Sequence, residues 1–187
     1  MMAGRILCIG DSNTYGYDPR SYIGSRYPED VRWTDRLSGF EVINCGVNGL
    51  TVPRDARRYI GQVNANDPDL VIVMLGTNDL CSGLSAEEIA GRMDAFIGEL
   101  AATGKQMMLI SPPLLQFGEW VMDDDMLYES QDLGALYRDV AEERGCLFAD
   151  AAEWGIDVTY DGVHFSPDGH ATFAQRLEEV LKGSSDS

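Results

Sequence analysis

The stretch Leu70–Leu75 reads Leu-Val-Ile-Val-Met-Leu and contains no polar side chain. An unbroken apolar run of this length is typical of a central strand in a parallel sheet, because helices cover both faces of such a strand. A five-stranded parallel sheet is therefore predicted around it. The other four strands are predicted at Arg5–Ile9, Phe40–Cys45, Gln106–Ile110 and Cys146–Ala149.

Helical patterns fill the intervals between these strands. Ser85 is followed three residues later by Glu88, which is the pattern of a capping box. Ser166 and Pro167 place a good capping residue directly before a proline, which suits the first position of a helix. Strands that alternate with helices predict a doubly wound α/β fold. Helices are predicted at Glu29–Leu37, Pro53–Val63, Ser85–Ala102, Leu127–Arg144 and Ser166–Lys182.

Length and composition limit the class of protein. The chain has 187 residues, 44% of them hydrophobic and 24% charged, which is the profile of a soluble globular protein. One domain is predicted over residues 1–187, with a frayed tail at 183–187. The net charge of −17 repels phosphate groups, so neither nucleic acids nor anionic membranes are expected partners. Met1–Gly10 resembles a first strand more than a signal peptide.

The cysteines indicate a reducing compartment. Cys8, Cys45, Cys81 and Cys146 are widely spaced and form no C-x-x-C pair. Most of them fall in or beside predicted strands, where a free thiol behaves as a small hydrophobic side chain. We therefore expect a cytoplasmic protein without a metal site.

Three predicted strands are followed closely by residues that suit a binding site. Ser12 follows the first strand, Gly49 the second and Asn78 the third. In parallel α/β sheets, ligands bind outside the carboxyl ends of the strands. We therefore expect these three residues at the same edge of the sheet.

The supply of histidine restricts the choice of a general base. The chain contains two histidines, His164 and His170. A serine hydroxyl becomes a nucleophile only beside a base, so a nucleophilic Ser12 needs one of them. Asp161 precedes His164 by three residues and can orient its ring from within a tight loop. The pattern predicts Ser12, His164 and Asp161 as a hydrolytic triad, and a packing or capping role for His170.

Acyl transfer also needs donors aimed at the oxygen on which negative charge develops. The expected donors are the backbone N–H groups of Ser12 and Gly49 and the side-chain amide of Asn78. Each of these segments is also ordinary turn or helix-start sequence. Their occurrence together at strand ends favours the catalytic interpretation. An alternative from another class is a flavodoxin-like binding protein whose loop 11–16 cradles a phosphate.

The same segments resemble, in order, the four sequence blocks of the SGNH hydrolases, also called the GDSL esterase/lipase family. Gly10-Asp11-Ser12 is similar to the nucleophile block, and Gly49 to the glycine block. Gly76-Thr77-Asn78-Asp79 is similar to the asparagine block, and Asp161-Gly162-Val163-His164 to the final block. The resemblance implies a flavodoxin-like three-layer α/β/α sandwich. It also implies a carboxylic-ester hydrolase that works without a metal or other cofactor.

The arylesterase and acyltransferase branch of that family shows a closer resemblance. This chain departs from the pattern at two positions. Asn13 stands where the GDSL motif of the family name has Leu, and Tyr15 stands where the branch often has Trp. These departures bear on substrate preference. The segments that carry the resemblance are residues 5–12, 30–34, 73–79, 111–113 and 161–165.

The function implied by the resemblance is a serine esterase that hydrolyses short, acetyl-like carboxylic esters through an acyl-enzyme. Acyl transfer is expected as a side activity, and a carbohydrate O-deacetylase is the alternative within the same chemistry. The expected partner is a small-molecule ester, and a homo-oligomer is left open. Segment 112–127 is interpreted as a lid, a subunit contact or a covering loop. Expected substrate-binding residues are Asp11, Asn13, Tyr15, Leu50, Leu80, Trp120, Val163 and Phe165.

Overall fold

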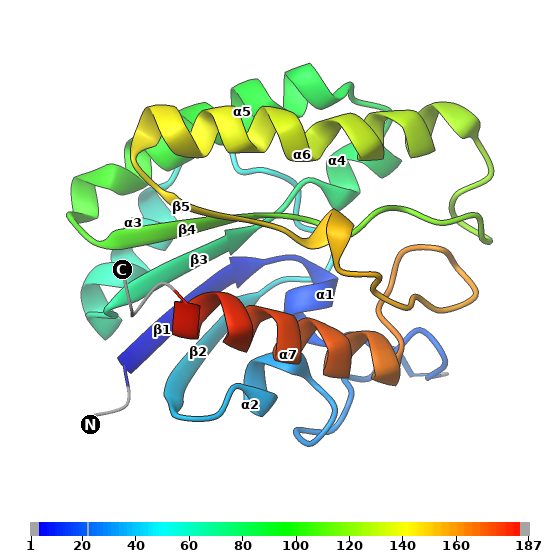
Figure 1. Ribbon diagram of the computed structural model, residues 1–187, viewed down its shortest axis with the longest axis horizontal. Coiled ribbons are helices and arrows are strands. Elements are labelled where there is room, and N and C mark those ends of the chain that lie inside the picture. The colour runs from blue at the N-terminus through cyan, green and yellow to red at the C-terminus, as the bar shows by residue number, and fades with distance from the viewer. Residues whose placement is uncertain (1–3, 22, 184–187) are drawn as a thin grey trace.

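The computed structural model of the chain describes residues 4–21 and 23–183. They contain a five-stranded parallel sheet in the order β2-β1-β3-β4-β5 (Figure 1). This is the flavodoxin-like order of a doubly wound sheet, so the predicted α/β class and five-stranded parallel sheet are confirmed. The strands are β1 Gly4–Gly10, β2 Phe40–Gly46, β3 Leu70–Met74, β4 Gln106–Ser111 and β5 Leu147–Asp150.

Helices cover both faces of the sheet and give the three layers visible in Figure 1. One face is covered by α3 (Arg57–Asn66), α4 (Thr77–Cys81), α5 (Ala86–Leu100) and α6 (Asp124–Arg144). The opposite face is covered by α2 (Trp33–Arg36) and α7 (Pro167–Gly183). The four-residue helix α1 (Ser12–Tyr15) follows directly at the carboxyl end of β1.

The central strand β3 shows why its sequence is apolar throughout. Val71 and Val73 pack into the hydrophobic core under α5 and α6. Ile72 and Met74 pack into the separate core beneath α7, because successive side chains of a strand point to opposite faces. Both sets are buried, so neither face of the strand tolerates a polar residue.

Local capping decides where several helices begin. The predicted capping box is present in α5, where Ser85 and Glu88 exchange side-chain and backbone hydrogen bonds. The prediction that a helix begins at Pro53 is wrong, because α3 starts only at Arg57. The Asp55 carboxylate accepts a hydrogen bond from the Arg57 backbone N–H in a local turn, and the N-cap Ala56 makes no side-chain capping bond.

The helix predicted over Glu29–Leu37 is also shorter than expected, since α2 covers only Trp33–Arg36. The backbone N–H groups of Val31 and Arg32 both donate to the carbonyl of Pro28 and close a separate turn. Arg32 then has an extended backbone, so the helix cannot begin before Trp33.

The last helix ends where the described part of the chain ends. Gly183 closes α7, and the rest of the predicted tail, 184–187, lies outside the described residues. Within residues 4–21 and 23–183, the structure contains no helix with the length and apolar character that crossing a membrane requires.

A buried tyrosine braces the end of β3 against α6. The Tyr137 hydroxyl donates to the Leu75 carbonyl at 2.9 Å, and the Tyr137 side chain is fully buried. Gly76 follows with φ of +127°, and a Cβ at this position would lie 2.9 Å from the Tyr137 hydroxyl oxygen. The bond therefore holds the chain at the point where it leaves the sheet toward Asn78.

We expect Tyr137→Phe to lower the free energy of unfolding by about 1–2 kcal/mol, because the buried Leu75 carbonyl loses its donor. Urea denaturation measures the change. The matched control is Tyr160→Phe, which removes an exposed bond from Tyr160 to the Pro19 carbonyl and should change stability by less than about 0.5 kcal/mol. Equal effects of the two substitutions would contradict the bracing role.

Candidate active site

Two segments from opposite ends of the chain meet at the carboxyl edge of the sheet. Ser12 is the first residue of α1, and Asp11 caps this helix by accepting a hydrogen bond from the Asn13 backbone N–H. Asp161 and His164 lie in the loop that joins β5 to α7. The structure therefore brings together the three residues that the sequence predicted as a triad.

Their side chains form a continuous chain of contacts. His164 Nε2 lies 3.1 Å from Ser12 Oγ, and His164 Nδ1 lies 2.7 Å from Asp161 Oδ2. The exposed fraction is 6% for Ser12, 3% for His164 and 1% for Asp161. A hydroxyl, an imidazole and a carboxylate in this order can pass a proton from the hydroxyl to the ring while the carboxylate orients the ring.

The electrostatics of Asp161 favour its ionised form. Burial acts to raise its pKa, but hydrogen bonds outweigh this effect and lower the pKa to about 2. These bonds come from the His164 ring and from the backbone N–H groups of Val163 and His164, both of which donate to Oδ1 at 2.9 Å. The carboxylate is therefore charged at neutral pH.

The loop after β2 is fastened to α4. The Asn78 amide donates to the Leu50 carbonyl at 3.0 Å, and the Val52 backbone N–H donates to Asp79 Oδ2 at 2.9 Å. Gly49 has φ of +74°, a conformation that favours glycine at this turn. An amide nitrogen carries two N–H groups, so the bond to Leu50 uses one of them.

Two aromatic rings contact the His164 imidazole. The Tyr17 ring lies at a centroid distance of 4.9 Å with a tilt of 57°, and the Trp120 ring lies at 5.1 Å and 79°. Sequence reasoning selected Trp120 but missed Tyr17. Gly16, whose φ of +90° ends α1, comes directly before Tyr17, but the sequence contains no signal that places Tyr17 beside His164.

The model of the GDSL-like lipase/acylhydrolase family matches residues 8–172. The chain belongs to this family. The resemblance drawn from the sequence blocks is thus confirmed, and with it the prediction of a carboxylic-ester hydrolase.

Individual relatives are similar over most of their length. An acetylxylan esterase from Geobacillus stearothermophilus is 26% identical over 160 residues, which cover 76% of this chain and 73% of that protein. The structure of an aryl esterase from M. smegmatis has a TM-score of 0.84 and 26% identity, covering 97% of this chain and 99% of that one. A carbohydrate acetylesterase from Sinorhizobium meliloti has a TM-score of 0.80 and 26% identity, covering 96% and 99%.

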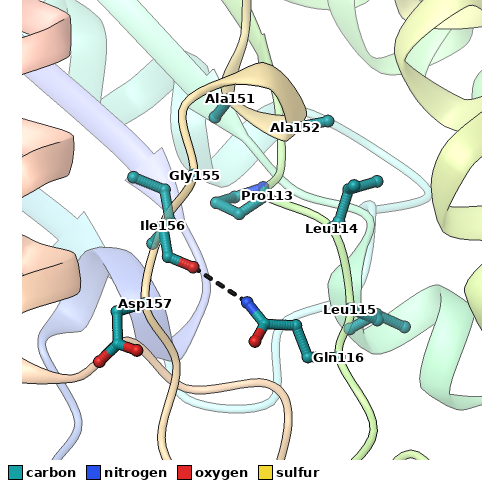
Figure 2. A pocket seen from close by; sticks show the side chains of 9 residues that line it. All are labelled: Pro113, Leu114, Leu115, Gln116, Ala151, Ala152, Gly155, Ile156 and Asp157. Carbon is teal, nitrogen blue, oxygen red and sulfur yellow. Dashed lines mark hydrogen bonds between the residues drawn. The ribbon is translucent and has the colours of Figure 1, made fainter.

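The structure also contains a cavity of about 420 Å³ (Figure 2). It opens between the loop after β4 and the loop after β5, and the Gln116 amide bridges the two loops by donating to the Ile156 carbonyl at 3.0 Å. Its lining does not include Ser12, Asp161 or His164. The cavity is thus distinct from the place where the triad atoms meet.

Some residues predicted to bind substrate lie inside the protein. Leu80 and Phe165 are 2% and 1% exposed and belong to the hydrophobic cores on the two faces of the sheet, and their contact with substrate stays a prediction. Val163 is also buried in the core under α5 and α6. Asn13 is buried, and both ends of its amide bond the backbone of loop 161–165.

The other predicted contacts remain predictions. Tyr15 and Leu50 are half-buried, and Trp120 is exposed.

Among the described residues, no group of three or more His, Cys, Asp or Glu side chains is placed to hold a metal ion.

The alternative of a phosphate-cradling loop does not fit the structure. A phosphate cradle requires backbone N–H groups that point to the ligand. In residues 13–17 these groups donate instead to the Asp11 side chain and to the carbonyls of Asp11 and Ser12. The N–H groups of this loop are therefore used in the hydrogen bonds of α1 and its caps.

His170 lies apart from these contacts. Its ring is fully buried against Tyr27 and Phe165, and its Nδ1 accepts a hydrogen bond from the Trp33 backbone N–H. Burial, helped by nearby arginine charges, lowers its pKa to about 3, so the ring is neutral at physiological pH. This agrees with the packing role predicted from the sequence.

Asp11 yields a pH-dependent prediction. Burial raises its pKa to about 6 from an ordinary value of 3.8, although the hydrogen bond from Asn13 and the nearby His164 act in the opposite direction. The folded protein therefore binds this proton more tightly than the unfolded chain does. The resulting contribution to stability is complete below the ordinary pKa and is lost as the pH rises through about 6.

We compare the free energy of unfolding of Asp11→Asn with that of the wild type; the asparagine keeps an oxygen to cap α1. As the pH rises from 4 to 7, we expect the difference to shift in favour of the variant by about 1–3 kcal/mol. Urea denaturation at both pH values measures this difference, in which any constant cost of the amide cancels. Asp18→Asn is the matched control, because the Asp18 carboxylate accepts the Arg20 N–H at an exposed position. A difference for Asp11→Asn that does not change with pH would disprove the assignment.

Proposed function

We propose that the hydrolase is a serine esterase that removes short, acetyl-like acyl groups, with Ser12 as the nucleophile. The observation that carries the proposal is the chain of contacts from Ser12 Oγ through His164 to the ionised Asp161. Supporting it is the position of these residues at the carboxyl edge of the sheet, together with the fastened loop of Gly49 and Leu50.

In the proposed reaction, Ser12 Oγ attacks the ester carbonyl carbon while His164 Nε2 takes the hydroxyl proton. Asp161 holds the ring through Nδ1 and stabilises the imidazolium that forms. The backbone N–H groups of Ser12 and Gly49 and the Asn78 amide donate to the oxyanion. The tetrahedral intermediate then expels the alcohol, which receives the proton from His164 Nε2 and leaves Ser12 acylated. Water, activated by His164, releases the acid by the reverse sequence.

The preference for acetyl groups is supported by relatives named as an acetylxylan esterase and a carbohydrate acetylesterase. A carbohydrate O-deacetylase is therefore the narrower form of the proposal. Acyl transfer to an alcohol follows the same path with the alcohol in place of water. We also propose a cytoplasmic location, which the free state of Cys8, Cys45, Cys81 and Cys146 supports.

Hydrolysis of p-nitrophenyl esters from acetyl to octanoyl tests both the nucleophile and the acyl preference. We expect wild-type kcat/KM to fall with chain length and Ser12→Ala to reduce every rate to background. Ser38→Ala is the matched control, because Ser38 is an exposed serine just before β2, at the opposite edge of the sheet from Ser12. Equal rates for Ser12→Ala and wild type would exclude Ser12 as nucleophile, and a flat chain-length profile would exclude a short acyl site.

Asp161→Asn tests the orienting role of the carboxylate. The amide cannot stabilise the imidazolium and can hold the ring in the wrong tautomer, so we expect kcat to fall by roughly 10³–10⁴-fold, as in other serine hydrolases. Steady-state hydrolysis of p-nitrophenyl acetate measures kcat, and a thermal melt shows that the variant is folded. Glu119→Gln removes an exposed carboxylate on the neighbouring loop and should leave kcat within about twofold. An Asp161→Asn enzyme within tenfold of wild type would refute the role.

A further inference from the structure

The proposed mechanism divides the substrate into two parts with different surroundings. His164 Nε2 must reach the oxygen of the departing alcohol in order to protonate it. The alcohol therefore leaves along the side of the site where the imidazole lies, while the carbonyl oxygen of the ester faces the proposed donors at Gly49 and Asn78. Residues that pack on the His164 ring and also reach solvent are placed to contact the alcohol.

Trp120 meets both conditions. Its ring lies 5.1 Å from the His164 ring in a T-shaped arrangement, and 53% of the residue is exposed. The Trp120 backbone N–H donates to the Asp161 carbonyl at 3.0 Å. The indole is thus attached by its own backbone to the loop that carries the proposed acid and base.

A second exposed aromatic residue lies on the neighbouring loop. It is Tyr160, whose carbonyl accepts the Glu119 backbone N–H. Apolar side chains that lie together at a protein surface often mark a binding site. In a chain of net charge −17, an aromatic surface beside the site favours a neutral ring over an anionic one.

We infer that Trp120 is a specificity-determining residue whose exposed indole receives the ring of the departing alcohol. The inference rests on the proposed function, since it takes His164 as the group that protonates this alcohol. The chemistry that the indole recognises is the apolar face of an uncharged six-membered ring. An aryl alcohol offers such a face by stacking, and a pyranose offers one through its axial C–H groups.

The experiment keeps the acyl group constant and varies the alcohol. Ethyl acetate, phenyl acetate and a mono-O-acetylated methyl pyranoside are hydrolysed by wild type, Trp120→Ala, Trp120→Phe and Phe117→Ala, and kcat/KM is compared. Trp120→Ala keeps the backbone donor to Asp161, so it removes only the ring. Phe117→Ala is the control, because Phe117 is exposed on the same loop.

We expect Trp120→Ala to lower kcat/KM for the ring-bearing acetates roughly tenfold, the scale of lost aromatic contact and apolar burial. Ethyl acetate should stay within about twofold of wild type, and Trp120→Phe should restore most of the loss. A loss confined to phenyl acetate identifies an aryl alcohol, and a loss confined to the pyranoside identifies a sugar.

Two results would overturn the inference. An equal loss on all three acetates would show that Trp120 acts by packing the His164 ring, and no loss on any would show that the indole takes no part. The proposed function fails by a different result, namely Ser12→Ala that still hydrolyses ethyl acetate. The two failures are therefore distinguishable within one set of assays.

Discussion

One side-chain amide joins the two ends of the chain at the site. Asn13 Nδ2 donates to the Val163 carbonyl at 3.1 Å, and Asn13 Oδ1 accepts the Phe165 backbone N–H at 2.9 Å. These two backbone positions flank His164, and Asn13 itself follows Ser12. The amide therefore fixes the separation between the hydroxyl and the imidazole across about 150 residues of sequence. An aspartate or leucine here lacks one or both halves of this pairing.

Two buried carboxylates near His164 have opposite environments, which separates their chemical roles. Asp161 accepts two backbone N–H groups as well as the imidazole, and these bonds hold it ionised against its burial. The Asp11 carboxylate accepts a hydrogen bond from the Asn13 backbone N–H. The effect of burial is larger than that of this bond and raises the pKa of Asp11 to about 6. Below that pH, Asp161 is the one of the two that still stabilises a charged imidazole. The number of donors therefore explains why Asp161, rather than Asp11, suits the proposed orienting role.

The sequence predicts the sheet well because strand formation here depends on local patterns. The run Leu70–Leu75 is apolar on both faces and is buried on both faces, and the residues after β1 and β3 fall at the carboxyl edge, as parallel connections require. The start of α3 was missed because residues after Pro53 form a turn closed by the Asp55 carboxylate, and the helix begins only after Ala56.

The site was predictable to the extent that chemistry restricts residue type. A base, its carboxylate and a hydroxyl can be chosen from the sequence because few residues can serve as the base. Tyr17 and the bonding of Asn13 were not predictable, because both arise from contacts between segments far apart in the chain. The packing of Leu80 and Phe165 into the two cores was not predictable for the same reason.

The loop with Trp120 and the loop with Asp161 are too closely fitted to vary separately. A Cβ on Gly162 would lie 2.0 Å from the Gln116 carbonyl oxygen, and one on Gly118 would lie 2.4 Å from the Asp161 carbonyl carbon. Gly162 also has φ of +82°, so a side chain there is strained as well as crowded. Backbone changes in either loop therefore displace the proposed acid and base. Side chains that project from this fixed backbone, Trp120 among them, are left as the positions where substrate preference can change without loss of the chemistry.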